Sequence, residues 1–193
     1  MIAMQEAKSW AFPTNLPTSP VPRIGQAAPP TEGLGIPSSE GRPAIVTFLR
    51  HCGCPFAEKT FLYLRATAAS NPTIRCIAIS HSSSSATDKW LEALGGRQSV
   101  EVIIDENREL FAQWGLGISS FWHVLSPWGL WDVYKLGKGE GIWNRPTESG
   151  TRWQTAGSFA CDGEGIVRWG GAAGSASDVP DFGETVKALE ADK

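Results

Sequence analysis

One stretch decides the fold of this chain: AIVTFLRHCGCPFAEK, residues 44–59. Its first six residues form a nearly continuous apolar run, which is typical of a central strand covered on both faces. The segment His51–Cys54 interrupts that run, and Pro55 follows it. Proline is favoured in the first turn of a helix, because its missing N–H would have no intrahelical partner there. The stretch therefore predicts a buried strand that leads through a short elbow with two cysteines into a helix.

The flanking sequence extends this unit into an alternating pattern. Apolar runs and turn residues predict strands at 73–80 and 100–105, each followed by a helix. A hairpin is then predicted from strands 158–162 and 166–169, and a last helix begins at Pro180. Alternating strands and helices indicate an α/β domain with a parallel sheet covered on both sides, here extended by one antiparallel hairpin.

Two regions lie outside this pattern. Residues 1–42 are rich in Pro, Gly, Ser and Thr and predict an extended N-terminal arm in front of a domain spanning 43–193. An irregular insertion is predicted at about 116–155, before the hairpin. The insertion is rich in aromatic residues, and this composition argues against disorder. They could pack the insertion onto the sheet, form a contact between two copies, or wall a pocket over Cys54. Six of the nine tryptophans lie in or beside the insertion: Trp114, Trp122, Trp128, Trp131, Trp143 and Trp153.

Charge and composition exclude several classes of function. The chain has 17 basic and 20 acidic residues and no basic cluster, which argues against nucleic acid or a membrane as a partner. It has no long apolar run and no signal-peptide pattern, so we expect a cytoplasmic protein. Four cysteines suit reduced thiols in that compartment. His51, Cys52 and Cys54 are too close in sequence for the usual metal-ligand spacing, so no metal is expected.

Cys54 is the expected catalytic residue. It lies at the start of the predicted helix, where free N–H groups and the helix dipole stabilise a thiolate, the nucleophilic form of cysteine. Arg50, His51 and Lys59 are near in sequence and could add positive potential. His51 could also transfer a proton, or it could be an ordinary loop histidine. The alternative for Cys54 is a buried residue that caps the helix without reactivity.

The other cysteines allow fewer roles. Cys52 could close a small, strained disulfide with Cys54 and so take part in catalysis. It could equally pack as a small apolar side chain at the end of the strand. Cys76 and Cys161 fall inside predicted strands, and we expect both to be core residues.

Three stretches resemble the peroxiredoxin-like proteins of the AhpC/TSA family, within the thioredoxin superfamily. Residues 23–29, RIGQAAP, are similar to that family's G-x-x-A-P segment. Residues 48–56, FLRHCGCPF, are similar to its F-x-R-H-x-x-C-P-x-C elbow, and residues 153–159, WQTAGSF, resemble its Q-x-G-G-x-F segment. The resemblance covers about residues 23–190. It implies a thioredoxin-like α/β fold, with a central mixed sheet flanked by helices and the tryptophan-rich insertion before the last hairpin.

The resemblance also implies a thiol-based antioxidant oxidoreductase. In this function the Cys54 thiolate reduces a peroxide and becomes a sulfenic acid, with Cys52 and His51 in the catalytic group. An external thiol such as glutathione or thioredoxin then restores Cys54, and no other cofactor is needed. Substrate contacts are expected from residues at the elbow and from residues in or after the insertion: Arg50, Pro55, Phe56, Trp122, Arg152, Trp153 and Gln154.

Two positions depart from the family pattern. Ala57 replaces the second cysteine, so a Cys-x-x-Cys disulfide cannot form and a one-cysteine cycle is the simpler one. His51 stands where peroxiredoxins have a threonine that orients the peroxide. Two other functions therefore stay open. One is an enzyme that acts on a bulky organic metabolite in a Trp-lined pocket, and the other is a non-catalytic module, such as a homodimer, that uses its aromatic surface as an interface.

Overall fold

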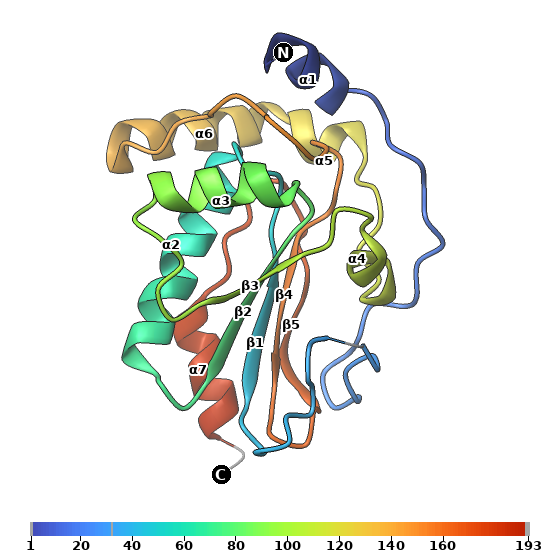
Figure 1. Cartoon of the computed structure of the whole chain (residues 1–193), viewed down its shortest axis with the longest axis vertical. Helices are drawn as coiled ribbons and strands as arrows, with labels where there is room; N and C mark the ends of the chain where they lie inside the picture. The colour runs from blue at the N-terminus through green and yellow to red at the C-terminus, as the bar shows by residue number, and fades with distance from the viewer. Residues whose placement is uncertain (1, 32, 192–193) are drawn as a thin grey trace.

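The computed structural model describes residues 2–31 and 33–191. A five-stranded sheet in the order β3-β2-β1-β4-β5 forms its centre (Figure 1). The strands are β1 (Ala44–Phe48), β2 (Arg75–Ser80), β3 (Glu101–Ile104), β4 (Gly157–Cys161) and β5 (Val167–Ala172). The helices are α1 (Ile2–Ser9), α2 (Pro55–Ser70), α3 (Ser84–Ala93), α4 (Glu109–Gln113), α5 (Phe121–Leu125), α6 (Pro127–Glu140) and α7 (Phe182–Glu190).

The pairing of the strands confirms the predicted mixed sheet. β1 pairs parallel with β2 and β2 parallel with β3, while β4 is antiparallel to both β1 and β5. All five residues of β1 are buried, as its apolar sequence predicted for a central strand. The late hairpin and the last helix also lie where the sequence placed them. No helix in the described part of the chain is long and apolar enough to cross a membrane.

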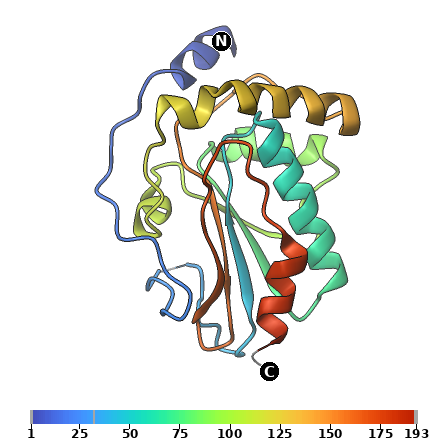
Figure 2. The ribbon, with the colours of Figure 1, turned by 180° about the vertical axis from the view of Figure 1, so that it is seen from behind.

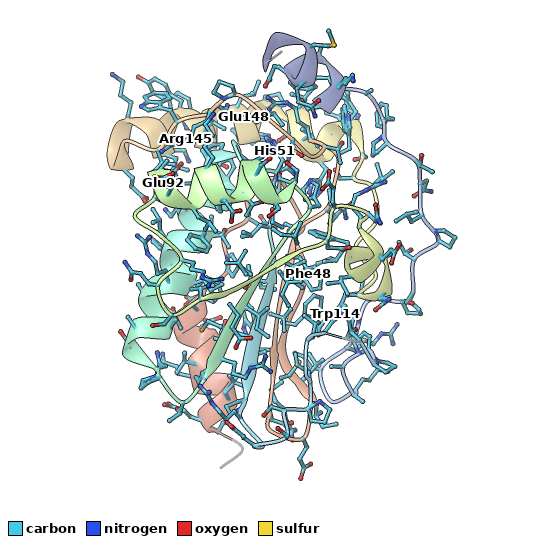
Figure 3. All side chains as sticks on the ribbon, in the orientation of Figure 1. Phe48, His51, Glu92, Trp114, Arg145 and Glu148 are labelled. Atoms are coloured by element: carbon cyan, nitrogen blue, oxygen red, sulfur yellow. The ribbon has the colours of Figure 1, made fainter. Side chains whose placement is uncertain are left out.

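Two layers cover the sheet. Helices α2 and α7 lie side by side on one face of the sheet (Figure 2). The core on this face contains Phe61 and Leu64 of α2 and Trp90 of α3. On the other face, α4 and the N-terminal arm cover a second core. Its largest side chains include Phe48 and Trp114, which Figure 3 shows on the α4 side of the strands. Helix α6 lies across one end of the sheet, above the end of β1 and the start of α2.

The prediction of an irregular insertion was wrong for residues 121–140, which form α5 and α6. The hydroxyl of Ser126 accepts a hydrogen bond from the Gly129 N–H, and Pro127 follows in the first turn of α6. Three glycines interrupt the apolar pattern of α6, which hid the helix in the sequence. One of them is required by packing, because a Cβ on Gly137 would lie 2.5 Å from the ring of Trp143.

The N-terminal arm also differs from the sequence prediction, because it begins with helix α1 rather than with extended chain. After α1 the arm runs along the α4 side of the sheet, as both ribbon views show. The Ser19 N–H donates to the carbonyl of Ala112 in α4, and a bridge joins Ala27 to Ile166. The arm thereby covers the second core along its length.

Candidate active site

Cys54 caps α2 at the point where the chain leaves β1. Its backbone is extended, with φ −75° and ψ 126°, and its side chain makes no capping hydrogen bond. The Cys54 N–H donates to the His51 carbonyl at 3.1 Å, and the Cys54 carbonyl accepts from the Glu58 N–H. Pro55 is the first residue of the helix, as predicted. Cys54 therefore adjoins the free N–H groups at the start of α2, and such groups stabilise negative charge.

The insertion covers this elbow. Cys54 is 6% exposed and packs with Phe56, Ala57, Leu136 and Ile142. Leu136 lies on α6 and Ile142 follows it, so residues far from Cys54 in sequence provide part of its apolar surroundings. The Cys54 side chain is thus placed at a helix start and is also sheltered from water.

A loop after α6 is fastened over the elbow. The Arg145 N–H donates to the Gly53 carbonyl at 3.0 Å. Its guanidinium also binds the buried Glu58 carboxylate, with an Nε–Oε2 distance of 3.0 Å. Gly53 has a φ of 124°, and a Cβ there would lie 3.0 Å from the Arg145 carbonyl oxygen. Only glycine gives the elbow this conformation and this close approach. Figure 3 shows Arg145 and His51 at the end of the sheet that α6 covers.

Cys52 faces the opposite side of the elbow. Its Sγ lies 3.7 Å from the hydroxyl oxygens of Ser80 and Thr87, inside the core under α2 and α3. Burial raises the pKa of the Cys52 thiol. Cys52 and Cys54 therefore belong to two different side-chain clusters, and all four cysteines are free thiols. This placement agrees with the packing role that the sequence allowed for Cys52.

Cys76 and Cys161 are core residues, as predicted. They lie in β2 and β4 with exposed fractions of 1% and 0%. Burial raises the pKa of each thiol to about 12, so both remain protonated at neutral pH. Neither side chain belongs to the apolar cluster around Cys54.

His51 is buried and neutral. Its Nδ1 lies 3.3 Å from the Thr147 hydroxyl. Burial, followed by the nearby charges of Arg50 and Arg152, lowers the pKa of His51 well below its usual value. At neutral pH this ring therefore does not supply the positive potential that its sequence position suggested. Lys59, another of the cations expected to help, pairs with Glu140 at the end of α6.

Arg50 is buried two residues after the end of β1, with part of its hydrogen-bonding capacity unused. Its Nη2 donates to the Arg152 carbonyl at 2.8 Å, while Nε and Nη1 have no partner among the residues that the structure describes. Arg50 and Phe56 both line a cavity of about 740 Å³. This cavity lies between the first turns of α2, the end of β5 and the segment before α7. The structure thus brings two of the predicted substrate-binding residues together.

Pro55, in the first turn of α2, does not line this cavity, and the four other predicted substrate-binding residues lie elsewhere. The Arg152 guanidinium binds the Glu6 carboxylate and the Ser9 hydroxyl of α1. Trp153 stacks on Phe12 with ring centroids 4.2 Å apart. Gln154 donates to the carbonyls of residues 116 and 117, and Trp122 is 72% exposed. None of these four residues lines the cavity beside Arg50.

Sequence reasoning missed two polar contributors to the site. Glu58 carries a weak signal, since acidic residues are favoured in the first turn of a helix. Thr147 carries none, although it contacts His51 and its N–H donates to the Glu6 carboxylate at 2.6 Å. Glu148 forms an ion pair with Lys89, and Arg145 forms one with Glu58. Among the described residues, no three His, Cys, Asp or Glu side chains gather into a possible metal site.

A family model agrees with this architecture. The model of the AhpC/TSA antioxidant enzymes matches residues 62–172. The chain belongs to the AhpC/TSA family. The match begins after the elbow, so it identifies the domain without including Cys54 itself. No curated protein sequence matches the chain.

Solved structures confirm the thioredoxin-like fold of this AhpC/TSA member. A thiol peroxidase from Chromobacterium violaceum has a TM-score of 0.57 and 16% identity, with 95% of each chain covered. A peroxiredoxin-like protein from Aquifex aeolicus has a TM-score of 0.61 and 15% identity, with 90% of each chain covered. A mutant of peroxiredoxin 6 from Arenicola marina has a TM-score of 0.60 and 14% identity, covering 87% of this chain and 72% of that one.

Family membership makes this AhpC/TSA protein an enzyme of thiol-based redox chemistry. The alternative of an enzyme that binds a bulky metabolite in a Trp-lined pocket is not favoured. None of the six tryptophans in or beside the insertion lines the cavity beside Arg50. Trp114 and Trp153 are buried, whereas four others are largely exposed: Trp122, Trp128, Trp131 and Trp143.

Proposed function

We propose that this AhpC/TSA enzyme is a peroxidase in which Cys54 is the reacting thiol. The Cys54 thiolate attacks one peroxide oxygen, so that an S–O bond forms and the O–O bond breaks. The departing oxygen takes up a proton and leaves as water or an alcohol, and Cys54 becomes a sulfenic acid. One observation carries the proposal: Cys54 caps the start of α2 with a side chain free of capping hydrogen bonds.

Two external thiols complete the cycle. The first condenses with the sulfenic acid, forming a mixed disulfide and releasing water. The second attacks the mixed disulfide, leaving as part of an external disulfide and restoring the Cys54 thiol. Ala57 supports this one-cysteine cycle, since no thiol follows Cys54 in the helix. The separate burial of Cys52 supports it too. Glutathione or thioredoxin in the cytoplasm would supply the thiols, with no further cofactor.

The test compares single-cysteine variants in a peroxide assay. Hydrogen peroxide and glutathione are supplied, and glutathione oxidation is followed for the wild type, Cys54→Ser, Cys52→Ser and Cys76→Ser. We expect Cys54→Ser to abolish turnover and Cys76→Ser, the matched buried control, to retain it. Dimedone should label the Cys54 peptide of the wild type only after peroxide is added. Full turnover in Cys54→Ser, or equal loss in Cys52→Ser, would contradict the proposal.

A further inference from the structure

Helix α6 exposes an aromatic side to solvent. Positions 128, 131, 135 and 138 recur with helical spacing, so their side chains follow one side of the helix. Val133 and Leu136 lie on the opposite side and pack in the cluster that contains Cys54. Five large apolar side chains on α6 and just after it are 47–77% exposed: Trp128, Leu130, Trp131, Tyr134 and Trp143. The helix thus covers the elbow with its inner side and leaves an aromatic outer side in water.

The exposed residues adjoin one another along the helix. The rings of Trp131 and Tyr134 are stacked, with centroids 5.4 Å apart. The ring of Trp143 lies against Gly137, so it widens the same surface. Helix α6 crosses one end of the molecule, as Figures 1 and 2 show, and a partner could therefore approach it along its whole length. We call the five apolar residues, together with Lys135 and Lys138, the α6 face.

The area of the α6 face is what a stable dimer needs. An aromatic side chain has a surface of roughly 150–250 Å², so the exposed fractions leave roughly 500–650 Å² of apolar side chain in water. The largest apolar patch on a typical monomer is about 300–600 Å². A standard protein interface buries about 800 Å² on each partner, and up to about two-thirds of that area is apolar. The α6 face alone supplies this apolar share.

The charges on the α6 face favour a protein surface over a membrane. Lys135 pairs with Asp132 at 2.8 Å, whereas Lys138 has no carboxylate partner in the part of the chain that the structure describes. A single lysine attracts an anionic membrane only weakly, because stable binding at a lipid surface takes a cluster of basic residues. An exposed tryptophan ring, such as that of Trp128, binds one lysine well. The α6 face therefore carries both a cation and a ring that fits it.

The spacing of these residues makes the α6 face complementary to itself. Trp128 and Lys138 lie about 15 Å apart along the helix, with their midpoint at residue 133. Trp131 and Tyr134 are centred at nearly the same point. A two-fold axis there would place Lys138 on the Trp128 ring of a second copy, and Trp131 against its Tyr134. Such a contact, in which both partners use the same surface, is the usual arrangement of homodimers.

We propose that two copies of this chain pair through the α6 face, with their α6 helices antiparallel about a two-fold axis near residue 133. The contact does not depend on the peroxidase reaction. It acts on the helix whose inner side shelters Cys54, because Leu136 packs in the Cys54 cluster. Dimer formation would thus hold the cover of the elbow in place.

Sedimentation velocity of the full chain, over micromolar concentrations and with a reductant present, tests the contact. We expect a reversible dimer, and Trp131→Gln should raise its Kd about tenfold or more, as loss of a central tryptophan does. Trp122→Gln is the matched control, because Trp122 is 72% exposed but lies on α5, outside the α6 face. A wild type that stays monomeric would overturn the proposal. So would a Kd that Trp131→Gln leaves unchanged or that both variants raise equally.

Crosslinking tests the antiparallel arrangement without removing a central tryptophan. In the Cys54→Ser background, Tyr134→Cys and Lys138→Cys are each treated with a short bismaleimide. About the proposed axis, the two copies of residue 134 are offset by only about 3 Å along the helices, and those of residue 138 by about 15 Å. We expect Tyr134→Cys to give a covalent dimer and Lys138→Cys to give none. Equal crosslinking of both variants, or of neither, would reject this arrangement.

A lipid assay tests the competing occupant of the α6 face. The wild type is sedimented with vesicles of phosphatidylcholine and phosphatidylserine. We expect the protein to stay in the supernatant at concentrations where it is a dimer. Vesicle binding by a chain that remains monomeric in solution would assign the face to a membrane and overturn the proposal.

Discussion

Arg145 and Glu58 form a two-point ion pair across the elbow, with distances of 3.0 Å for Nε–Oε2 and 3.3 Å for Nη2–Oε1. Glu58 is in the first turn of α2, and its side chain is 9% exposed, whereas that of Arg145 is 44% exposed. The same arginine donates its backbone N–H to Gly53. The loop after α6 is therefore held to both sides of Cys54, to the residue before it and to the first helical turn after it.

Arg145→Met should loosen this loop. Glu58 would lose its charged partner while staying mostly buried, so we expect the free energy of unfolding to fall by about 1–3 kcal/mol. Native Cys54 should also react faster with iodoacetamide, because its cover opens more often. Urea denaturation and peptide mapping by mass spectrometry measure the two effects. Lys89→Met is the control, since the exposed Lys89–Glu148 pair should contribute about 0.5 kcal/mol or less. Equal losses in the two variants would show that the buried pair has no special role.

Gly53→Ala should disturb the elbow from its backbone. The φ of 124° is unfavourable for alanine, and the new Cβ would press on carbonyl oxygens of Arg145 and Pro146. We expect a loss of about 2 kcal/mol or more in the free energy of unfolding. Chemical denaturation measures it, with Gly139→Ala as the control. Gly139 lies within α6 and has open space, so alanine should be neutral or stabilising there. Wild-type stability of Gly53→Ala would show that the elbow relaxes freely.

Stability should fall as the pH falls through the titration range of His81. Burial lowers the pKa of His81 from 6.5 to about 4, so the native state keeps the ring neutral while the unfolded chain takes up a proton. This contribution is complete above the unfolded value of 6.5 and is lost as the pH falls toward 4. The loss should be on the order of 2–3 kcal/mol, measured by urea denaturation over that range.

A substitution separates His81 from the other histidines. His81→Gln removes the titration and keeps a donor for the Thr151 carbonyl, which His81 Nε2 contacts at 3.1 Å. We expect a flatter pH dependence in this variant. His123→Gln is the matched control, and its effect on the slope should be smaller because that ring is only partly buried. An identical slope in His81→Gln and the wild type would mean that the native ring takes up its proton over the same pH range as in the unfolded chain.

Alkylation of the folded protein should distinguish the four thiols. With a pKa of about 12, Cys76 and Cys161 would be thiolates in roughly one molecule in ten thousand at about pH 8. Burial also raises the pKa of Cys52, whereas Cys54 lies at the helix start. We expect brief iodoacetamide treatment to label Cys54 first, as peptide mapping would show, and all four only in urea. Early labelling of Cys76 would reveal an opening of the sheet.

The elbow could be predicted from sequence because its signals are local. An apolar run, a break and Pro55 fixed the end of β1, the position of Cys54 and the start of α2 within a short segment. The partners of those residues could not be predicted in the same way. Leu136 and Thr147 approach the elbow only because α6 crosses the end of the sheet, and α6 itself was hidden by its glycines.

Arg50 and Arg152 also show that long-range partners could not be predicted from the sequence. Both were predicted to bind substrate, and their sequence positions do not show which of them finds partners inside the protein. Arg152 finds Glu6 and Ser9 on α1, from the arm that the sequence described only as extended chain. Arg50 finds one backbone carbonyl and keeps two donors free of partners in the described chain. Long-range packing, rather than residue type, decides which arginine is engaged by the protein.

Helix α1 has a practical consequence through Glu6. Its carboxylate binds Thr147 and Arg152, and Thr147 in turn contacts His51 in the elbow. Trimming the first ten residues to ease crystallisation would thus remove a partner of Thr147, the residue that contacts His51. Recombinant versions intended for kinetic work are better extended at the opposite terminus, after α7.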